Sequence, residues 1–255
     1  MKKVLVCAGM VLGMCGFVLA GEHPLIEVDG RYWMPNLEAS VRVVESDIGA
    51  EFNAKDDLGV DDENFPDGRI IWNASPNSRI RLGYTQIEYS GSQDVTRSID
   101  FNGQTYSAGT LVESELKLNY IRLGWIWQFI NMFDEKLKLG PIVEAKGIMA
   151  EVSLDAPNLT PAVSESEEFA GGLPTAGLAL DIAPIEQVNL FCEASGLYVG
   201  DYGYFLDAEA GVEFKPIKYV SIIGGYRIID MKIEDEPSFA NVRMDGPFAG
   251  GKINF

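Results

Sequence analysis

The sequence predicts an all-β fold, an antiparallel transmembrane β-barrel of about ten strands. Three observations lead to this prediction: a secretion signal at the N-terminus, polar and apolar residues that alternate with a period of two, and connections that alternate between short and long. Barrels of bacterial membranes have an even number of strands, with short turns at one end and longer loops at the other. The connection 200–202 is short although its place in the order makes it an outer loop, so the pattern also permits eight or twelve strands.

The first twenty residues have the pattern of a signal peptide. Lys2 and Lys3 precede an apolar run, and the small residue Ala20 stands before Gly21. The run is shorter than the roughly 20 residues of a membrane-spanning helix. A lipoprotein signal at Cys15 is an alternative, although Met14 occupies a position where a small residue is usual. We expect residues 1–20 to be removed and 21–255 to form a single barrel domain.

Charge and cysteine content exclude several classes of protein. Cleavage would remove Cys7 and Cys15 and leave Cys192 as the only cysteine, so no intramolecular disulfide is expected. A formal net charge of −18 and the lack of a basic patch argue against nucleic acid as a partner. Beyond the signal, no apolar stretch is long enough for a spanning helix, so membrane insertion requires strands.

Half-apolar strands recur along the mature chain. The clearest is Glu115–Phe129, where Leu123 and Trp125 alternate with Arg122 and Gly124. The expected strands are 24–34, 68–75, 79–92, 113–129, 136–153, 170–183, 187–199, 203–215, 218–233 and 241–255. Alternation also fits a soluble sandwich, whose strands likewise have an inner and an outer face. Strand length and the asymmetry of the connections favour the barrel.

The connections predict which end of the barrel faces the periplasm. The expected tight turns are 76–77, 131–135, 184–186 and 216–217. The expected longer outer loops are 35–67, 93–112, 154–169 and 234–240. The segment 37–57 is partly alternating and predicts a hairpin above the membrane or a segment inside the lumen. Asn102-Gly103 predicts a second hairpin, because Asn-Gly suits a type I′ turn.

Charged residues of both signs fall on the predicted inner face. Unpaired charges in a confined lumen are costly, so we expect them to form an ion-paired network. A selective channel lining is the alternative, because rings of charge also set selectivity. The predicted network consists of Arg79, Arg81, Arg122, Glu144, Lys146, Glu193, Asp207, Glu209, Glu213 and Arg227.

The connection 45–67 is strongly acidic. Dense carboxylates can bind Ca²⁺ or Mg²⁺ through oxygen ligands, although the spacing does not match an EF-hand. Acidic runs are more often solvated surfaces. The weak candidates for a divalent cation site are Asp56, Asp57, Asp61, Asp62 and Glu63. No Cys/His constellation suits zinc, and no cofactor is expected.

Aromatic residues on the outer face predict girdles at the membrane interfaces. The main candidates are Trp33, Trp125, Trp127 and Phe255, together with Trp72, Tyr219 and Tyr226. The same residues would fill the core of a soluble sandwich. Cys192 lies on the apolar face and is expected to face lipid as a small hydrophobic residue.

The last strand ends in the aromatic residue Phe255, after the alternating run Gly251, Ile253, Phe255. This ending resembles the assembly signal of bacterial outer-membrane barrels, and the chain in general character resembles small barrels of the OmpA, OmpX and OmpW type. No motif assigns it to one of them. The resemblance implies an outer-membrane location and, as partners, membrane lipids, lipopolysaccharide and the barrel-assembly machinery.

Catalytic chemistry has little support in the sequence. Barrel enzymes of the outer membrane resemble one another in using a histidine base, and the only histidine here is His23, close to the predicted mature N-terminus. We therefore expect a non-enzymatic, porin-like or structural membrane protein of a Gram-negative cell, with a surface-interaction or narrow-pore role. The alternatives are a soluble all-β ligand-binding protein and, less well supported, a lipid-modifying barrel enzyme.

Overall fold

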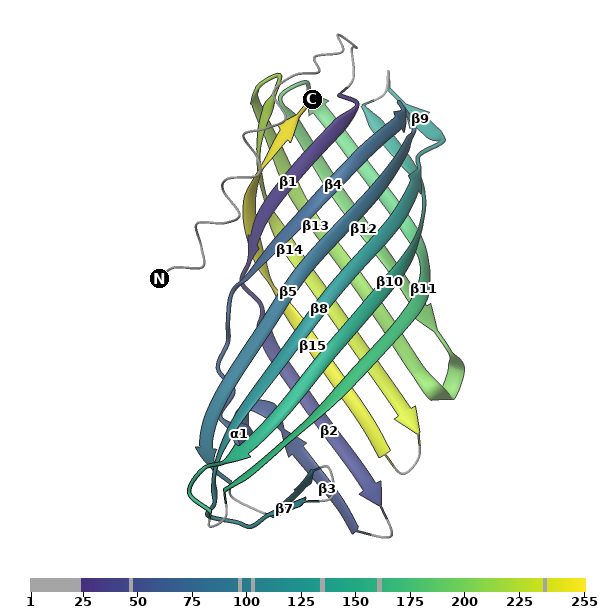
Figure 1. The fold of residues 1–255 in the computed structure, drawn as a ribbon. Coiled ribbons are helices and arrows are strands. Elements are labelled where there is room, and N and C mark those ends of the chain that lie inside the picture. The colour runs from purple at the N-terminus through teal and green to yellow at the C-terminus, as the bar shows by residue number, and fades with distance from the viewer. Residues whose placement is uncertain are drawn as a thin grey trace.

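Ten antiparallel strands form a closed barrel in the computed structural model (Figure 1). The structure describes residues 24–45, 48–95, 98–101, 104–133, 136–159, 162–235 and 238–255. The barrel strands are β1 (Ile26–Trp33), β4 (Phe65–Ser75), β5 (Ser78–Asp94), β8 (Leu111–Trp127), β10 (Leu137–Ala156), β11 (Val163–Ile185), β12 (Val188–Tyr198), β13 (Gly203–Ile217), β14 (Val220–Asp235) and β15 (Ser238–Asn254).

Pairing of the first strand with the last closes the ring. Val28 of β1 lies opposite Ile253 of β15 and, on its other side, opposite Ile70 of β4. The barrel strands follow one another in chain order around the ring. The described chain begins and ends at the same end of the barrel (Figure 1), where the turns are short, as in bacterial barrels whose termini are periplasmic. The predicted ten-stranded antiparallel barrel is therefore confirmed.

A hairpin extends the wall at the opposite end. After Pro35, β2 (Asn36–Glu45) continues along β15, with Asn36 opposite Asp245, and then pairs with β3 (Ile48–Asn53). This is the hairpin predicted above the membrane. The helix α1 (Ala54–Leu58) follows it. No helix in the described part of the chain is long and apolar enough to cross a membrane.

Four short elements complete the described structure. The strands β6 (Ile99–Phe101) and β7 (Gln104–Tyr106) pair as the hairpin that Asn-Gly predicted, with Phe101 opposite Gln104. The strand β9 (Ile130–Met132) folds back on β10, so β8 ends at Trp127 instead of 129. The 3-10 helix η2 (Gly200–Tyr202) joins β12 to β13.

Two of the four predicted long loops are wrong. Residues 154–169 and 234–240 belong mostly to strands, because β10 reaches Ala156, β11 begins at Val163, and β14 and β15 extend to Asp235 and Ser238. The acidic segment after Val163 resembles a solvated loop in sequence. Its backbone nevertheless pairs with β10, and a strand outside the bilayer can expose polar side chains on its outer face.

The polarity of the wall reverses along the strands. Near the termini, β5 points Leu82 and Tyr84 outward and Arg81 inward. Farther along the same strand, Ile87 and Tyr89 are buried inside, and Glu88 is exposed. An apolar outer face suits lipid, and a polar outer face suits water. The membrane boundary therefore lies just beyond Tyr84, and the rest of the barrel protrudes on the side opposite the termini.

Candidate functional site

The structure places all ten residues of the predicted charge network in the lumen. Each lies at an inward position of its strand, where the period-two alternation puts successive inward side chains above one another. Their side chains are buried or, for Arg79, half-buried. Each has at least one ion-pair partner of opposite charge.

Asp207 on β13 is the centre of one layer of this network, the layer farther from the chain termini. Its carboxylate accepts hydrogen bonds from Arg227 Nη2 at 3.0 Å, from Lys146 Nζ at 3.1 Å and from the Tyr120 hydroxyl at 2.9 Å. These donors come from β14, β10 and β8, so the contacts cross the barrel. A fully buried carboxylate requires such compensation, because an isolated one would be strongly destabilising.

Arg81 is the centre of a second layer nearer the termini. Its guanidinium bridges Glu144 Oε1 at 2.9 Å and Glu193 Oε2 at 2.5 Å. Ser195 donates its hydroxyl to Glu144 Oε2 at 2.5 Å, and Lys146 Nζ lies 3.1 Å from the same carboxylate. Through Lys146 the two layers are continuous.

The sequence interpretation missed four members of the network, which form two Asp-Gly-Arg triplets. Asp29-Gly30-Arg31 lies on β1, and Asp67-Gly68-Arg69 lies beside it on β4 with Gly30 opposite Gly68. In each triplet the arginine Nε bonds the aspartate of its own strand, and both arginines also bond Glu209. Charged residues two apart in a strand share a face, and this repeated spacing is the signal that could have revealed them.

Asp67 connects the triplets to the layer around Asp207. Its Oδ2 accepts hydrogen bonds from Arg122 Nη2 at 2.7 Å, from Arg227 Nη1 at 3.0 Å and from the Thr85 hydroxyl at 2.7 Å. The sequence interpretation assigned Asp67 to the acidic outer loop. Its position in the lumen shows that β4 starts earlier than predicted, at Phe65 instead of 68.

The open space in the lumen narrows from the terminal end inward. A vestibule of about 710 Å³ near the termini is lined by residues such as Glu27, Arg79 and Asp181. Beyond it lie cavities of about 40 Å³, beside Arg31 and Arg81, and about 10 Å³. A cavity needs on the order of 10–15 Å³ to hold one water molecule. Each of these two cavities among the charged layers can therefore hold few water molecules.

An apolar plug fills the barrel beyond the charged layers. It includes Trp33, Phe65, Tyr89 and Phe205, and the rings of Phe65 and Tyr89 meet edge to face at 5.0 Å. The prediction that Trp33 is an interface residue is wrong, since its side chain is only 1% exposed. Trp33 lies at an inward position, donates Nε1–H to the Gly246 carbonyl at 3.2 Å, and lies under the Arg227 guanidinium.

The other predicted aromatic residues lie on the outer surface. Trp125 and Trp127 stack with centroids 6.2 Å apart, and Phe255 is also exposed at the terminal end, as are Trp72 and Tyr219. Tyr226 is exposed on β14. Cys192 is exposed among outward-facing residues of β12. The outer belt is therefore apolar and aromatic, as a lipid-facing surface requires.

The described side chains of the acidic connection make contacts around α1 and do not converge on a common metal position. Asn53 caps the helix by accepting from the backbone N–H of Lys55 and Asp56, and the Asn53 N–H bonds Asp57 at 2.8 Å. No group of three or more His, Cys, Asp or Glu side chains in the described residues is arranged to hold a metal ion. This applies to the candidates Asp56, Asp57, Asp61, Asp62 and Glu63.

Asp62 fastens α1 to the barrel wall. Its carboxylate accepts from the Leu37 backbone N–H and from Lys55 Nζ, both at 2.8 Å. Partial burial of the carboxyl favours its protonated form, but the hydrogen bonds from Lys55 and Leu37 outweigh this effect and lower its pKa. Asp62 is therefore ionised and structural at neutral pH.

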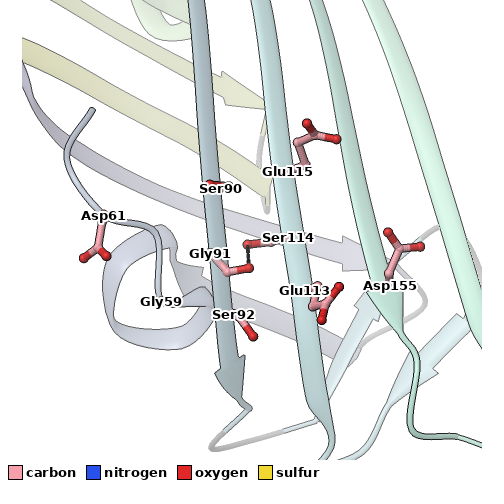
Figure 2. A pocket seen from close by; sticks show the side chains of 9 residues that line it. All are labelled: Gly59, Asp61, Ser90, Gly91, Ser92, Glu113, Ser114, Glu115 and Asp155. Carbon is pink, nitrogen blue, oxygen red and sulfur yellow. Dashed lines mark hydrogen bonds between the residues drawn. The ribbon is translucent and has the colours of Figure 1, made fainter. Parts of the chain in front are cut away.

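A groove of about 540 Å³ crosses the outer end of β5, β8 and β10 (Figure 2). It is lined by Gly59, Asp61, Ser90, Gly91, Ser92, Glu113, Ser114, Glu115 and Asp155. Four of these residues are acidic and none is basic. The Ser114 hydroxyl donates to the Leu58 and Gly91 carbonyls and is used in packing α1 against the wall. The groove makes this face strongly acidic.

Two sequence predictions concern residues outside the described part of the chain. These are the signal peptide at 1–20 and His23 as a terminal residue without a catalytic role. Both stay predictions.

Solved structures with similar folds are bacterial outer-membrane barrels. The outer membrane protease OmpT from Escherichia coli matches with a TM-score of 0.59 at 10% identity, over 90% of this chain and 96% of that chain. The chain has the fold of an outer-membrane β-barrel. This fold and the apolar outer belt place it in the lipid of the outer membrane of a Gram-negative bacterium.

Other barrels match less closely. The translocator domain of the autotransporter NalP from Neisseria meningitidis gives 0.46 at 11% identity, over 98% and 92% of the two chains. Neisserial surface protein A gives 0.36 at 15% identity, over 90% and 97%. No protein-family model matches the sequence, and no curated protein matches it significantly. At these identities the likeness concerns the fold alone.

Proposed function

We propose that this protein is a non-enzymatic outer-membrane barrel whose lumen is closed and whose protruding half serves as a cell-surface interaction platform. The observation that carries the proposal is the cross-barrel network around Asp207, Asp67 and Arg81, in which buried charges of opposite sign compensate one another. A conducting pore needs a hydrated path, and paired side chains that fill the lumen oppose one.

Two features of the interior support closure. The cavities within the charged layers are about 40 Å³ and 10 Å³, and the apolar plug beyond them contains fully buried aromatic side chains such as Trp33 and Tyr89. An apolar constriction resists wetting. Ions entering from the vestibule would meet first a layer of paired charges and then a dry layer.

The absence of enzymatic activity is part of the proposal. OmpT is a protease, but a likeness at 10% identity supports the fold only. The single histidine of the sequence, His23, precedes the first strand, and a general base must lie within hydrogen-bonding reach of its substrate. Turnover of fluorogenic peptides or phospholipid by the reconstituted protein, lost in His23→Ala, would contradict this part of the proposal.

The proposed partners are the membrane lipids around the barrel and lipopolysaccharide. For assembly, we propose that the last strand is recognised through Phe255, which is exposed and whose backbone N–H bonds the Ile26 carbonyl at 2.9 Å. Phe255→Ala should lower the fraction of protein that reaches the heat-modifiable folded form in cells. Tyr219→Ala, an exposed aromatic nearby that is not terminal, is the control and should have a smaller effect.

Conductance of the purified protein in a planar bilayer tests closure. The change in gel mobility on boiling first verifies that the protein is folded, so that a lack of current cannot be attributed to unfolded protein. We expect no discrete current steps at 1 M KCl from preparations in which the protein is folded. Reproducible steps from the wild-type protein would overturn the closed-lumen proposal and favour a narrow pore.

A further inference from the structure

One strand of the protruding half has an unpaired edge. Along its whole length to Ile182, β11 pairs with β10, from Val163 opposite Ala156 onward. On its other side β12 pairs with β11 only from Ala176, which lies opposite Gly196. In the described part of the chain, no strand pairs with that side of Val163–Thr175. Figure 1 shows β11 continuing past the end of the β12–β13 hairpin.

The unpaired edge lies outside the bilayer. The hairpin of β12 and β13 ends in exposed tyrosines, with Tyr198 75% and Tyr202 71% exposed, as is typical of residues at a membrane interface. The edge begins at the level of that hairpin and runs away from the termini. Water or a partner must therefore satisfy its backbone groups, because an open edge is not tolerated within lipid.

Pro174 indicates which backbone groups face the edge. In an antiparallel strand, the N–H and C=O of one residue point to the same side and those of the next residue to the other. A proline is accommodated in a paired strand where its missing N–H would face away from the ladder. Residues of the same parity, including Ser166, Glu168 and Ala170, then present N–H and C=O groups to the open side.

The charge of this edge is negative. Glu165, Glu167 and Glu168 lie on it, and β11 contains no lysine or arginine. On the neighbouring strand, Glu151 lies opposite Glu168, and the acidic groove of Figure 2 continues this surface across β8 and β5. Phe169 is 62% exposed, although its inward parity would bury it in a closed wall.

We propose that the Val163–Thr175 edge binds an extended, cationic polypeptide segment by strand addition. Backbone hydrogen bonds would supply affinity, and side chains would supply specificity: basic residues against Glu168 on the outward face of the strand, and apolar residues against Phe169 on the opposite face. The inference rests on the surface-interaction role proposed above and names its partner class. A second copy of the chain fits poorly, because two such edges would oppose carboxylates with carboxylates.

Binding of synthetic peptides to the purified full-length protein in detergent tests the inference. The probe is a fluorescent 12-residue peptide of alternating lysine and valine, followed by anisotropy at low and at 150 mM salt. We expect saturable binding that weakens as salt screens the charges. A peptide of the same sequence N-methylated at alternate residues keeps the charge but cannot pair, and we expect at least tenfold weaker binding.

Two variants locate the site on the protein. Ser166→Pro removes an N–H that faces the edge, and Ser166→Ala is its matched control; binding should be lost in the first and kept in the second. Glu167→Gln with Glu168→Gln should weaken binding at least tenfold, and gel mobility verifies that each variant is folded. Equal binding of the methylated and unmethylated peptides, or by the Gln variant and the wild type, would overturn the proposal.

Other outcomes also decide the question. Absence of binding would mean that the carboxylates only protect the edge from aggregation. A dimer of the protein in detergent that excludes the peptide would assign the edge to a second copy. Both results would overturn the inference, and neither would affect the closed lumen, which conductance measures separately.

Discussion

At the scale of single residues, several charges in the lumen are shared between two or more partners of opposite sign. Arg227 bonds both Asp207 and Asp67, and Lys146 contacts both Asp207 and Glu144. Removing one member of a buried pair leaves a charge without compensation, which is strongly destabilising. Sharing moderates that cost for Arg227 and Lys146, because Arg227 keeps Asp67 and Lys146 keeps Glu144 when Asp207 is changed.

Asp207→Asn tests this arrangement. The substitution keeps the shape of the side chain but removes the charge that faces Arg227, Lys146 and Tyr120. We expect the free energy of unfolding to fall by about 3 kcal/mol, measured from tryptophan fluorescence in lipid vesicles across a urea gradient. The exposed Glu88→Gln is the control, with a change within about 0.5 kcal/mol. Equal effects would contradict the importance of the network.

The lowered pKa of Asp62 predicts that the local stability of α1 depends on pH. Its pKa is lowered below the ordinary value of 3.8 in the folded protein, so its contribution to stability is complete above pH 3.8 and is lost as pH falls through the folded pKa. We therefore expect hydrogen exchange at Ala54–Leu58 to accelerate on acidification below pH 4, relative to exchange in the barrel strands.

A matched substitution separates Asp62 from other carboxylates. Asp62→Asn should already show fast exchange in Ala54–Leu58 at neutral pH, because it loses the ion pair with Lys55. Asp61→Asn, its exposed neighbour, should behave as wild type. Slow exchange in Asp62→Asn at all pH values would show that packing alone holds the helix.

At the scale of elements, one strand serves two environments. The terminal part of β5 turns apolar side chains toward lipid, and its outer part turns them toward the plug. Because the side-chain period of a strand is two, the parity does not change, and only the residue types on each face are exchanged. The point of exchange marks the membrane surface.

Leu82→Arg and Ser90→Arg test that boundary on the same face of one strand. Leu82 is 48% exposed within the apolar belt, and an arginine there should reduce stability by about 2–4 kcal/mol in lipid vesicles. At Ser90, above the boundary, the change should be at most about 1 kcal/mol. Similar losses at both positions would mean that the bilayer extends farther along β5.

The sequence was most informative where a strand has one face in lipid. There the alternation is strong, as in Leu123 and Trp125 against Arg122, and strand number and inner face were predicted. It was misleading above the membrane, where Val163–Phe169 exposes polar side chains on a paired backbone and resembles a loop. The prediction for Trp33 was wrong for a related reason, since an aromatic residue suits a membrane interface and an apolar plug equally well.

The interior could be predicted only in part. The ten predicted charges follow from strand parity, whereas Asp29, Arg31, Asp67 and Arg69 were not predicted, although the repeated Asp-Gly-Arg spacing places the two charges of each triplet on one face of a strand. Which charge pairs with which depends on barrel closure, as in the contact of Arg69 on β4 with Glu209 on β13. The unpaired edge of β11 depends on the relative lengths of neighbouring strands, which a single sequence does not reveal.

At the scale of the whole molecule, the structure is a barrel that stands partly in lipid and partly above it. The vestibule faces the terminal end, the paired charges occupy the lipid-embedded interior, and the plug fills the protruding half. This order agrees with the proposed closed lumen and with the proposed orientation, which places the acidic face outside the cell.

The most direct test of this account is labelling of single cysteines on intact cells, in a Cys192→Ser background, with a membrane-impermeant maleimide. We predict that Ser90→Cys is labelled on intact cells, Ser75→Cys only after the outer membrane is permeabilised, and Leu82→Cys weakly in both conditions. Labelling of Ser75→Cys on intact cells, or protection of Ser90→Cys, would contradict the proposed orientation and the position of the membrane surface.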